Sequence, residues 1–192
     1  MRTDAVTQDR PESPSAAPGE LELVRSFANT LDVEAETDRL GTATEARDWL
    51  IEQGVELPPG LRPGELRSLI GFREAIREAV AARGTETGAE AIAELNRIAS
   101  AHAISVRLGS GGAPFAARST GVDGFIERVL GIVATAAIDG SWERLKACPN
   151  DRCRWLFYDH SRNRSRTWCS MGVCGARSKM RTYRSRHRAS TR

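Results

Sequence analysis

Apolar residues between positions 20 and 140 recur mostly every three or four residues, which is the spacing of one buried face of an α-helix. The stripe is clearest over residues 65–83, where arginines stand at the margin of a run of leucine, isoleucine and valine. Gly54 and Gly84 follow two of these segments, and glycine often ends a helix. The pattern predicts helices over residues 20–31, 42–53, 65–83, 87–102 and 122–139.

Two segments depart from the helical pattern. Residues 103–108 alternate apolar and polar side chains, residues 109–112 are rich in glycine, and residues 114–119 return, which predicts a β-hairpin. Residues 1–19 are rich in proline, serine, alanine and charge. Because they cannot bury enough apolar surface to offset the entropy lost on ordering, we expect a disordered tail. The body over residues 20–140 is therefore expected to be helical with one hairpin.

The net charge of +3 for 192 residues conceals an uneven distribution. Residues 141–192 carry 14 Lys and Arg against 3 Asp and Glu, whereas residues 1–140 carry 14 against 22. This asymmetry predicts an acidic body with a basic module that binds a polyanion. The chain has no run of eighteen apolar residues and no apolar core behind Met1. We therefore expect neither a membrane span nor a signal peptide, and a cytoplasmic location.

All four cysteines lie in the basic module, as two pairs with equal gaps of four residues. They are Cys148, Cys153, Cys169 and Cys174. Two short loops that each provide two thiolates can form a tetrahedral zinc site. Such a site has no open position for water or substrate, so we expect one structural zinc ion and no enzymatic activity. The spacing leaves open an iron–sulfur cluster, or two disulfides in an oxidising compartment.

Large apolar residues follow the first pair of cysteines, at Trp155, Leu156 and Phe157. A small zinc module has little apolar surface, so these residues are expected to provide a core of its own. With separate cores, replacing Cys169 should unfold the module and leave the body folded. The loop that comes next, residues 161–166, is polar and basic.

Beyond Cys174 an arginine recurs every three or four residues, which places a row of positive charge on one face of a helix. The row contains Arg177, Arg181, Arg184 and Arg188. Like charges at this spacing repel one another, and a polyanion would remove that cost. A neighbouring face is expected to pack on the cysteine module, and it contains Val173, Ala176, Met180 and Tyr183.

The sequence around the cysteines resembles the CGNR zinc finger, which is named for a Cys-Gly-Asn-Arg signature. The resemblance extends over about residues 142–188. Besides the cysteines, it rests on Trp142, Arg144, Leu145, Lys146, residues 154–159, 161–163, 165–166, 168, 170–171, Gly175, Arg177 and Lys179. The signature here has Ala176 in place of the asparagine, so any contact of that asparagine side chain is missing.

The family pairs this finger with an N-terminal ABATE domain, a helical module assigned to stress-induced transcription regulation. Residues 27–30, residues 49–50, the arginine-bearing helix and the hairpin resemble that domain over about 20–140. The expected fold is therefore mainly α with one β-hairpin. A disordered tail (1–19) would precede the helical domain (20–140), and a small four-cysteine zinc finger with a basic C-terminal helix (141–192) would follow.

The resemblance and the charge distribution imply a DNA-binding transcriptional regulator, whose body senses a small-molecule effector or forms a homodimer. RNA binding or ribosome association is the alternative, because a basic zinc module binds phosphates of either nucleic acid. Another is a ligand-binding or protein-interaction module with a purely structural finger. Polar residues at the edges of apolar helices are candidates for a ligand pocket, namely Asn29, Thr30 and Arg73. The candidate nucleic-acid contacts are Arg162, Arg164, Arg166, Arg177, Lys179, Arg181, Arg184 and Arg188.

Overall fold

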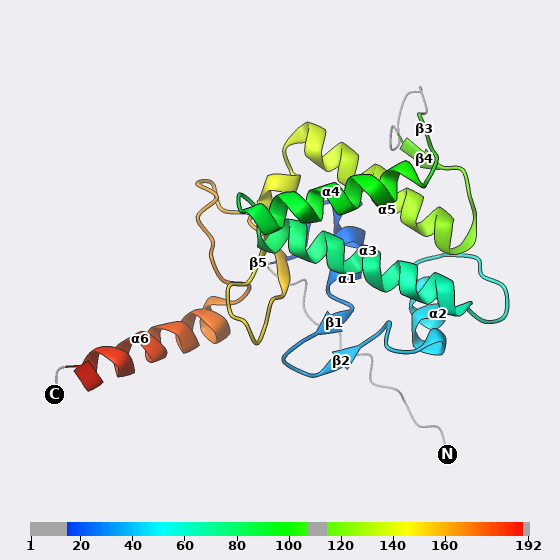
Figure 1. Ribbon diagram of the computed structural model, residues 1–192. Helices are drawn as coiled ribbons and strands as arrows, with labels where there is room; N and C mark the ends of the chain where they lie inside the picture. Colours follow the sequence, from blue (N-terminus) through cyan, green and yellow to red (C-terminus); the bar gives the residue numbers. More distant parts are fainter. Residues whose placement is uncertain (1–14, 107–114, 190–192) are drawn as a thin grey trace, which may run out of the picture.

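The computed structural model describes residues 15–106 and 115–189, with side chains described as far as Ser185. Its helices are α1 (Leu21–Ala28), α2 (Ala43–Glu52), α3 (Pro63–Ala81), α4 (Glu86–Ser100), α5 (Gly121–Asp139) and α6 (Ala176–Ala189). A 3₁₀ turn (Trp142–Arg144) and a π-type turn (Met171–Gly175) complete the helical elements of this part. Figure 1 shows α1 to α5 gathered into a body and α6 at one end. Among the described residues, no helix combines the length and the apolar character that crossing a bilayer requires.

The strands form antiparallel pairs of two or three residues. They are β1 (Leu31–Asp32) with β2 (Thr37–Asp38), β3 (Ile104–Val106) with β4 (Phe115–Ala117), and β5 (Leu145–Ala147) with β6 (Leu156–Tyr158). The prediction of a mainly α fold is confirmed, and the predicted hairpin is the β3–β4 pair, whose turn at 107–114 lies outside the described residues. The sequence did not predict β1–β2 and β5–β6, because strands this short contain too little alternation to recognise.

Local sequence signals fix where two of the body helices begin. The hydroxyl of Thr42 accepts a hydrogen bond from the Glu45 amide at 3.2 Å, which caps α2. Helix α3 begins at Pro63, two residues before the predicted start, since proline suits the first helical position. The Glu65 carboxylate accepts from the Arg62 amide at 2.7 Å and satisfies a further donor of this first turn.

Aromatic rings from different helices meet in the centre of the body. Phe27 of α1 lies 5.7 Å from both Trp49 and Phe72, and 5.1 Å from Phe125, between ring centroids. These side chains are at most 2% exposed, so Trp49 is a core residue. Tilted and edge-on aromatic contacts add to the apolar area that they bury.

The zinc-finger region does not have the separate core that the sequence suggested. Leu145 and Leu156, on β5 and β6, are fully buried in the same apolar cluster as α1, α3 and α5. The smaller cluster beside the cysteines contains the cysteines themselves with Trp155 and Trp168. A module this small cannot bury its own apolar residues, and the β5–β6 hairpin therefore packs against the body.

The segment before α1 differs from the predicted disorder over residues 15–19; the rest of the predicted tail, residues 1–14, lies outside the described part. Ser15 and Ala17 are buried, with 3% and 8% exposure. The carbonyl oxygen of Ser15 accepts from the Tyr158 amide at 2.9 Å, and the Ser15 hydroxyl donates to the Cys169 carbonyl at 3.1 Å. This stretch is ordered by backbone partners on the finger, which its composition could not reveal.

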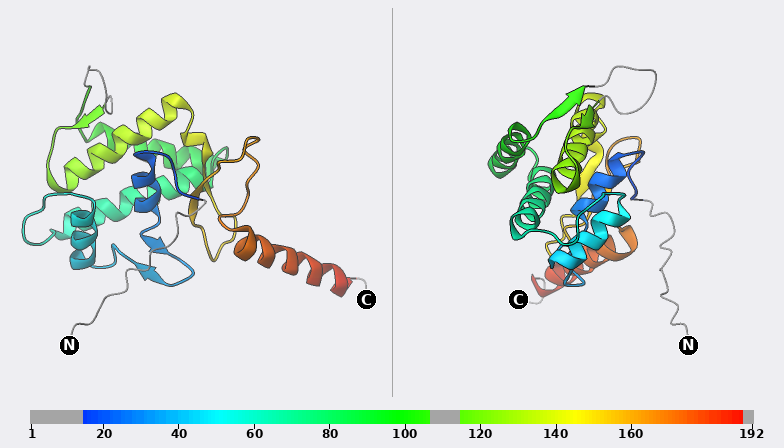
Figure 2. Two further views of the ribbon diagram at one scale, coloured as in Figure 1. Left: turned by 180° about the vertical axis from the view of Figure 1, so that it is seen from behind. Right: turned by 90° about the vertical axis from the view of Figure 1, so that its right-hand side faces the viewer.

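Helix α6 projects from the rest of the molecule, as Figures 1 and 2 show from opposite sides. The apolar face that the sequence analysis expects to pack on the finger, which begins at Val173 in the preceding turn, stays largely exposed. Val173, Met180 and Tyr183 are 45%, 52% and 57% exposed. About half of each of these side chains stays accessible to solvent, so packing within the described chain covers this face only in part.

Candidate metal centre and nucleic-acid interface

Two tight loops bring the cysteines together. Cys148 follows β5, and its amide donates to the Trp155 carbonyl at 2.9 Å, which closes the first loop. Within that loop the Cys153 amide donates to the Asn150 carbonyl at 2.7 Å. In the second loop, the hydroxyl of Ser170 accepts from the Val173 amide at 3.3 Å and starts the turn that leads into α6.

The four sulfur atoms fit a tetrahedral zinc ion. All lie within 4.8 Å of one another, with 3.5 Å between Cys153 and Cys169 and 3.7 Å between Cys169 and Cys174. A Zn–S distance of 2.3 Å places the sulfurs of a regular tetrahedron about 3.8 Å apart. Cys148, Cys153 and Cys174 are buried and Cys169 is half-buried. These residues would hold a closed site, in which zinc supplies a cross-link between the loops rather than reactive chemistry.

The crowding of the thiols shows why a cation suits this cluster. A hydrogen bond from Cys169 lowers the pKa of Cys153 to about 6. The pKa of Cys169 is raised, because its proton is held in that hydrogen bond and because burial and the neighbouring negative charge disfavour a second thiolate. A divalent cation at the centre removes this repulsion and lets all four sulfurs ionise.

A buried carboxylate shapes the loop between β6 and the second pair of cysteines. Asp159 is fully buried and accepts from Lys146 Nζ at 2.7 Å and from the Ser161 and Arg166 amides, both at 2.9 Å. Burial alone would raise the pKa of Asp159, but these hydrogen bonds hold it well below its usual range. The types and spacing of Asp159 and Lys146 did not predict this contact, and only their place in the CGNR resemblance could have indicated a role for them.

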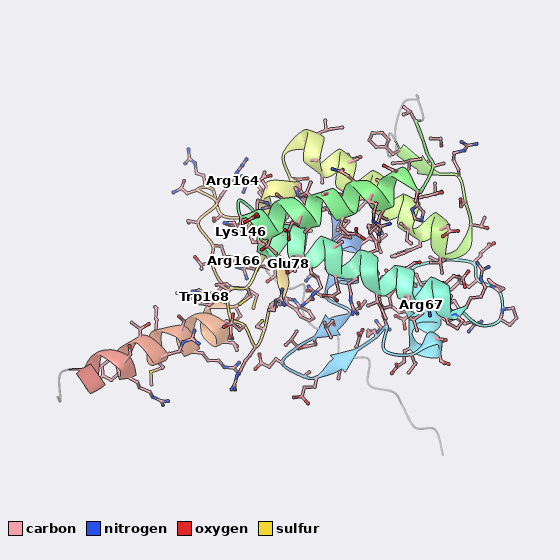
Figure 3. All side chains as sticks on the ribbon, viewed as in Figure 1. Arg67, Glu78, Lys146, Arg164, Arg166 and Trp168 are labelled. Carbon is pink, nitrogen blue, oxygen red and sulfur yellow. The ribbon has the colours of Figure 1, made fainter. Side chains whose placement is uncertain are left out.

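The basic loop divides into one internal and two external arginines. Arg166 Nε donates to the Trp168 carbonyl at 2.9 Å, and its guanidinium lies 5.0 Å from the ring centre of Phe157. It also donates to the hydroxyl of Ser15 at 2.9 Å. Arg166 therefore helps to hold the finger together, and its predicted nucleic-acid contact stays a prediction. Arg162 and Arg164 are exposed, and Figure 3 shows Arg164 at the finger end of the molecule.

The described cationic residues of α6, from Arg177 to Arg184, are exposed, but they differ in their partners. Arg177 forms an ion pair with Glu34 of the β1–β2 turn. Lys179, Arg181 and Arg184 have no ion pair among the described residues. Lys179 lies on nearly the opposite side of the helix from Arg181, because two residues span 200° of an α-helix. Arg188 belongs to α6, and its side chain lies outside the described residues.

Ala176 replaces the signature asparagine at the first residue of α6. Its position is exposed, beside the buried Cys174 and Gly175. The missing asparagine side chain therefore belongs to the outer surface of the finger, and its replacement leaves the sulfur cluster intact.

The predicted ligand-pocket residues bind the protein itself. The Asn29 side chain donates to the Leu156 carbonyl and accepts from the Leu156 amide, both at 2.8 Å. Thr30 Oγ1 donates to the Phe27 carbonyl at 2.8 Å, and an Arg73 nitrogen donates to an Asp38 carboxylate oxygen at 3.0 Å. All three predicted residues are buried. They have structural roles, and Asn29 joins α1 to the finger strand β6, while the ligand pocket stays a prediction.

Replacing Asn29 with aspartate should destabilise the protein by about 3 kcal/mol or more. The change keeps the acceptor for the Leu156 amide but sets a carboxylate oxygen against the Leu156 carbonyl, and a buried unpaired charge is costly. Urea unfolding would measure this loss. Asn96→Asp, the same change at an exposed position on α4, is the matched control. Equal stability of the two variants would show that the Asn29 contact contributes nothing.

Comparison with protein families gives two matches that follow one another along the chain. The ABATE family, described as "Putative stress-induced transcription regulator", matches residues 21–140. The CGNR zinc finger matches residues 144–187, which include all four cysteines. No curated protein matches the chain. The finger match and the sulfur cluster together assign one structural zinc ion to residues of this module.

Proposed function

This chain belongs to the ABATE family and carries a CGNR zinc finger, and we propose that this zinc-binding regulator docks on duplex DNA through α6. The exposed loop with Arg162 and Arg164 would add phosphate contacts from the same end of the molecule. The predicted effector and the predicted homodimer remain expectations from the sequence and are not needed for this docking.

The observation that carries the proposal is a pair of exposed arginines on the projecting helix α6, Arg181 and Arg184, which have no ion pair among the described residues. An isolated helix of about this length is marginally stable in water, and like charges one turn apart destabilise it further. Arg181 and Arg184 have no anionic partner among the described residues that would offset this cost. A polyanion would provide one, which favours nucleic acid over a solvated tail.

The shape of α6 favours duplex DNA over duplex RNA. A helix with its side chains is about 10–12 Å across, and the major groove of B-DNA is about 12 Å wide. The major groove of A-form RNA is too deep and narrow to admit side chains. Structural zinc would serve this docking by fixing the turn from which α6 starts.

The proposal is tested by titrating the zinc-loaded protein with duplex DNA and with a structured RNA of equal length. We expect tighter binding to DNA, with a log–log salt slope near −3.6, if about four arginines contact phosphate. The four are Arg162, Arg164, Arg181 and Arg184. If the protein bound RNA as tightly as DNA, the alternative function, RNA binding, would be supported in place of DNA docking. Binding that does not depend on salt would refute docking on phosphates.

A further inference from the structure

The acidic β1–β2 turn of the body reaches the basic helix of the finger. Glu34, in this turn, pairs with Arg177 on the first turn of α6, although the two residues are 143 positions apart. Arg177 is the arginine of the signature, and it is the α6 arginine that has an anionic partner within the described chain. A carboxylate binds a guanidinium in the same way as a phosphate does.

The turn is built to present this carboxylate. Asp32 Oδ1 accepts from the amides of Glu34 and Ala35, each at 3.0 Å, which fixes the shape of the turn. At the base of the hairpin, Asp38 binds Arg73 of α3, whose side chain is 3% exposed. The position of Glu34 is therefore set by the body rather than by a freely moving loop.

The contact between the turn and the finger is sparse, so it can open without loss of packing. Glu34 borders a hollow of about 430 Å³ that extends to Trp155 and Val173. Glu34 also borders a second hollow, of about 820 Å³, which extends to Arg181. The Glu34 and Arg177 side chains are 41% and 56% exposed, and exposed ion pairs of this kind are weak.

We propose that Glu34 is an internal competitor for phosphate at Arg177, and thus an autoinhibitory contact that tunes nucleic-acid affinity. The inference rests on the proposed DNA docking. Binding would exchange one anion on Arg177 for another, since a phosphate oxygen replaces the Glu34 carboxylate and no covalent bond changes. Arg177 would then add little to the affinity of the wild-type protein, and it would become a full phosphate contact once Glu34 is neutral.

The direction in which Glu34→Gln changes the affinity for duplex DNA tests the proposal. The variant should bind duplex DNA roughly two- to fivefold tighter, which is the range of exposed ion pairs. Its log–log salt slope should be steeper by about 0.9, since one more arginine releases counterions. Glu36→Gln is the matched control, because it removes the same charge two residues away, at an exposed position with no ion pair among the described residues.

The background variant Arg177→Gln separates competition from general charge. There, Glu34→Gln should change neither the affinity nor the salt slope. Weaker binding by Glu34→Gln would show that the pair orients α6, and an equal gain from Glu36→Gln would show a bulk charge effect; either result overturns the proposal. If the wild-type protein shows no salt-dependent binding, the proposed function itself fails, and the competition fails with it.

Discussion

Cys169→Ser should destabilise the helical body as well as the finger. Loss of the fourth thiolate should reduce bound zinc from about one ion per chain to far less. The β5–β6 hairpin would then no longer be fixed by the metal site. Its residues Leu145 and Leu156, both fully buried in the common core, would become exposed to solvent. Two leucines contribute about 3–6 kcal/mol of burial free energy, a large share of the stability of a domain.

Hydrogen exchange of the α1 and α3 amides would locate this effect in the body, and urea unfolding would give its size. Chelation of zinc from the wild-type protein should reproduce it. Met171→Leu, an exposed change in the same loop, should retain both zinc and stability. Unchanged exchange in α1 and α3 after zinc loss would mean that the two regions fold independently after all.

Hydrophobic spacing was sufficient to locate the helices of the body, because each repeats its apolar residues over at least two turns, although α1 ends at Ala28, before the predicted end at residue 31. It could not show where the β5–β6 hairpin packs. Leu156 and Phe157 would be apolar in either case, whether they formed a separate core of the finger or packed against the body. That choice depends on how much apolar surface α1 and α3 leave uncovered, which is a property of the assembled fold.

The chemistry of the finger was predictable where residue type and spacing determine it. Cysteine pairs are specific for a metal or a redox site, and the structure brings the four sulfurs together. Arginine is not specific in this way. Arg162, Arg164 and Arg166 alternate in one polar loop, yet Arg166 turns inward to carbonyl oxygens and the Phe157 ring. The structural role of Asn29 could not be predicted from its residue type either, since its hydrogen-bond partner Leu156 lies 127 positions away along the chain.

The double variant Arg181→Ala, Arg184→Ala should lose roughly 60-fold in affinity for duplex DNA at about 0.1 M salt, since two phosphate contacts are removed. The log–log salt slope should flatten by about two units, and all DNA sequences should be affected alike. If one of the two arginines reads guanine, its loss would also cost about 1–3 kcal/mol at the preferred site alone. Alanine is the strongest helix former, so the loss cannot be attributed to a melted α6.

Arg67→Ala with Arg97→Ala is the matched control for net charge. Both arginines are exposed on the body, and Figure 3 shows Arg67 at the end of α3 far from the finger. The control should keep the salt slope of the wild-type protein, because these charges lie outside the docking face. An equal effect of both double variants would indicate attraction by overall charge. If the α6 variant keeps zinc, affinity and slope, its arginines are solvated and DNA docks elsewhere.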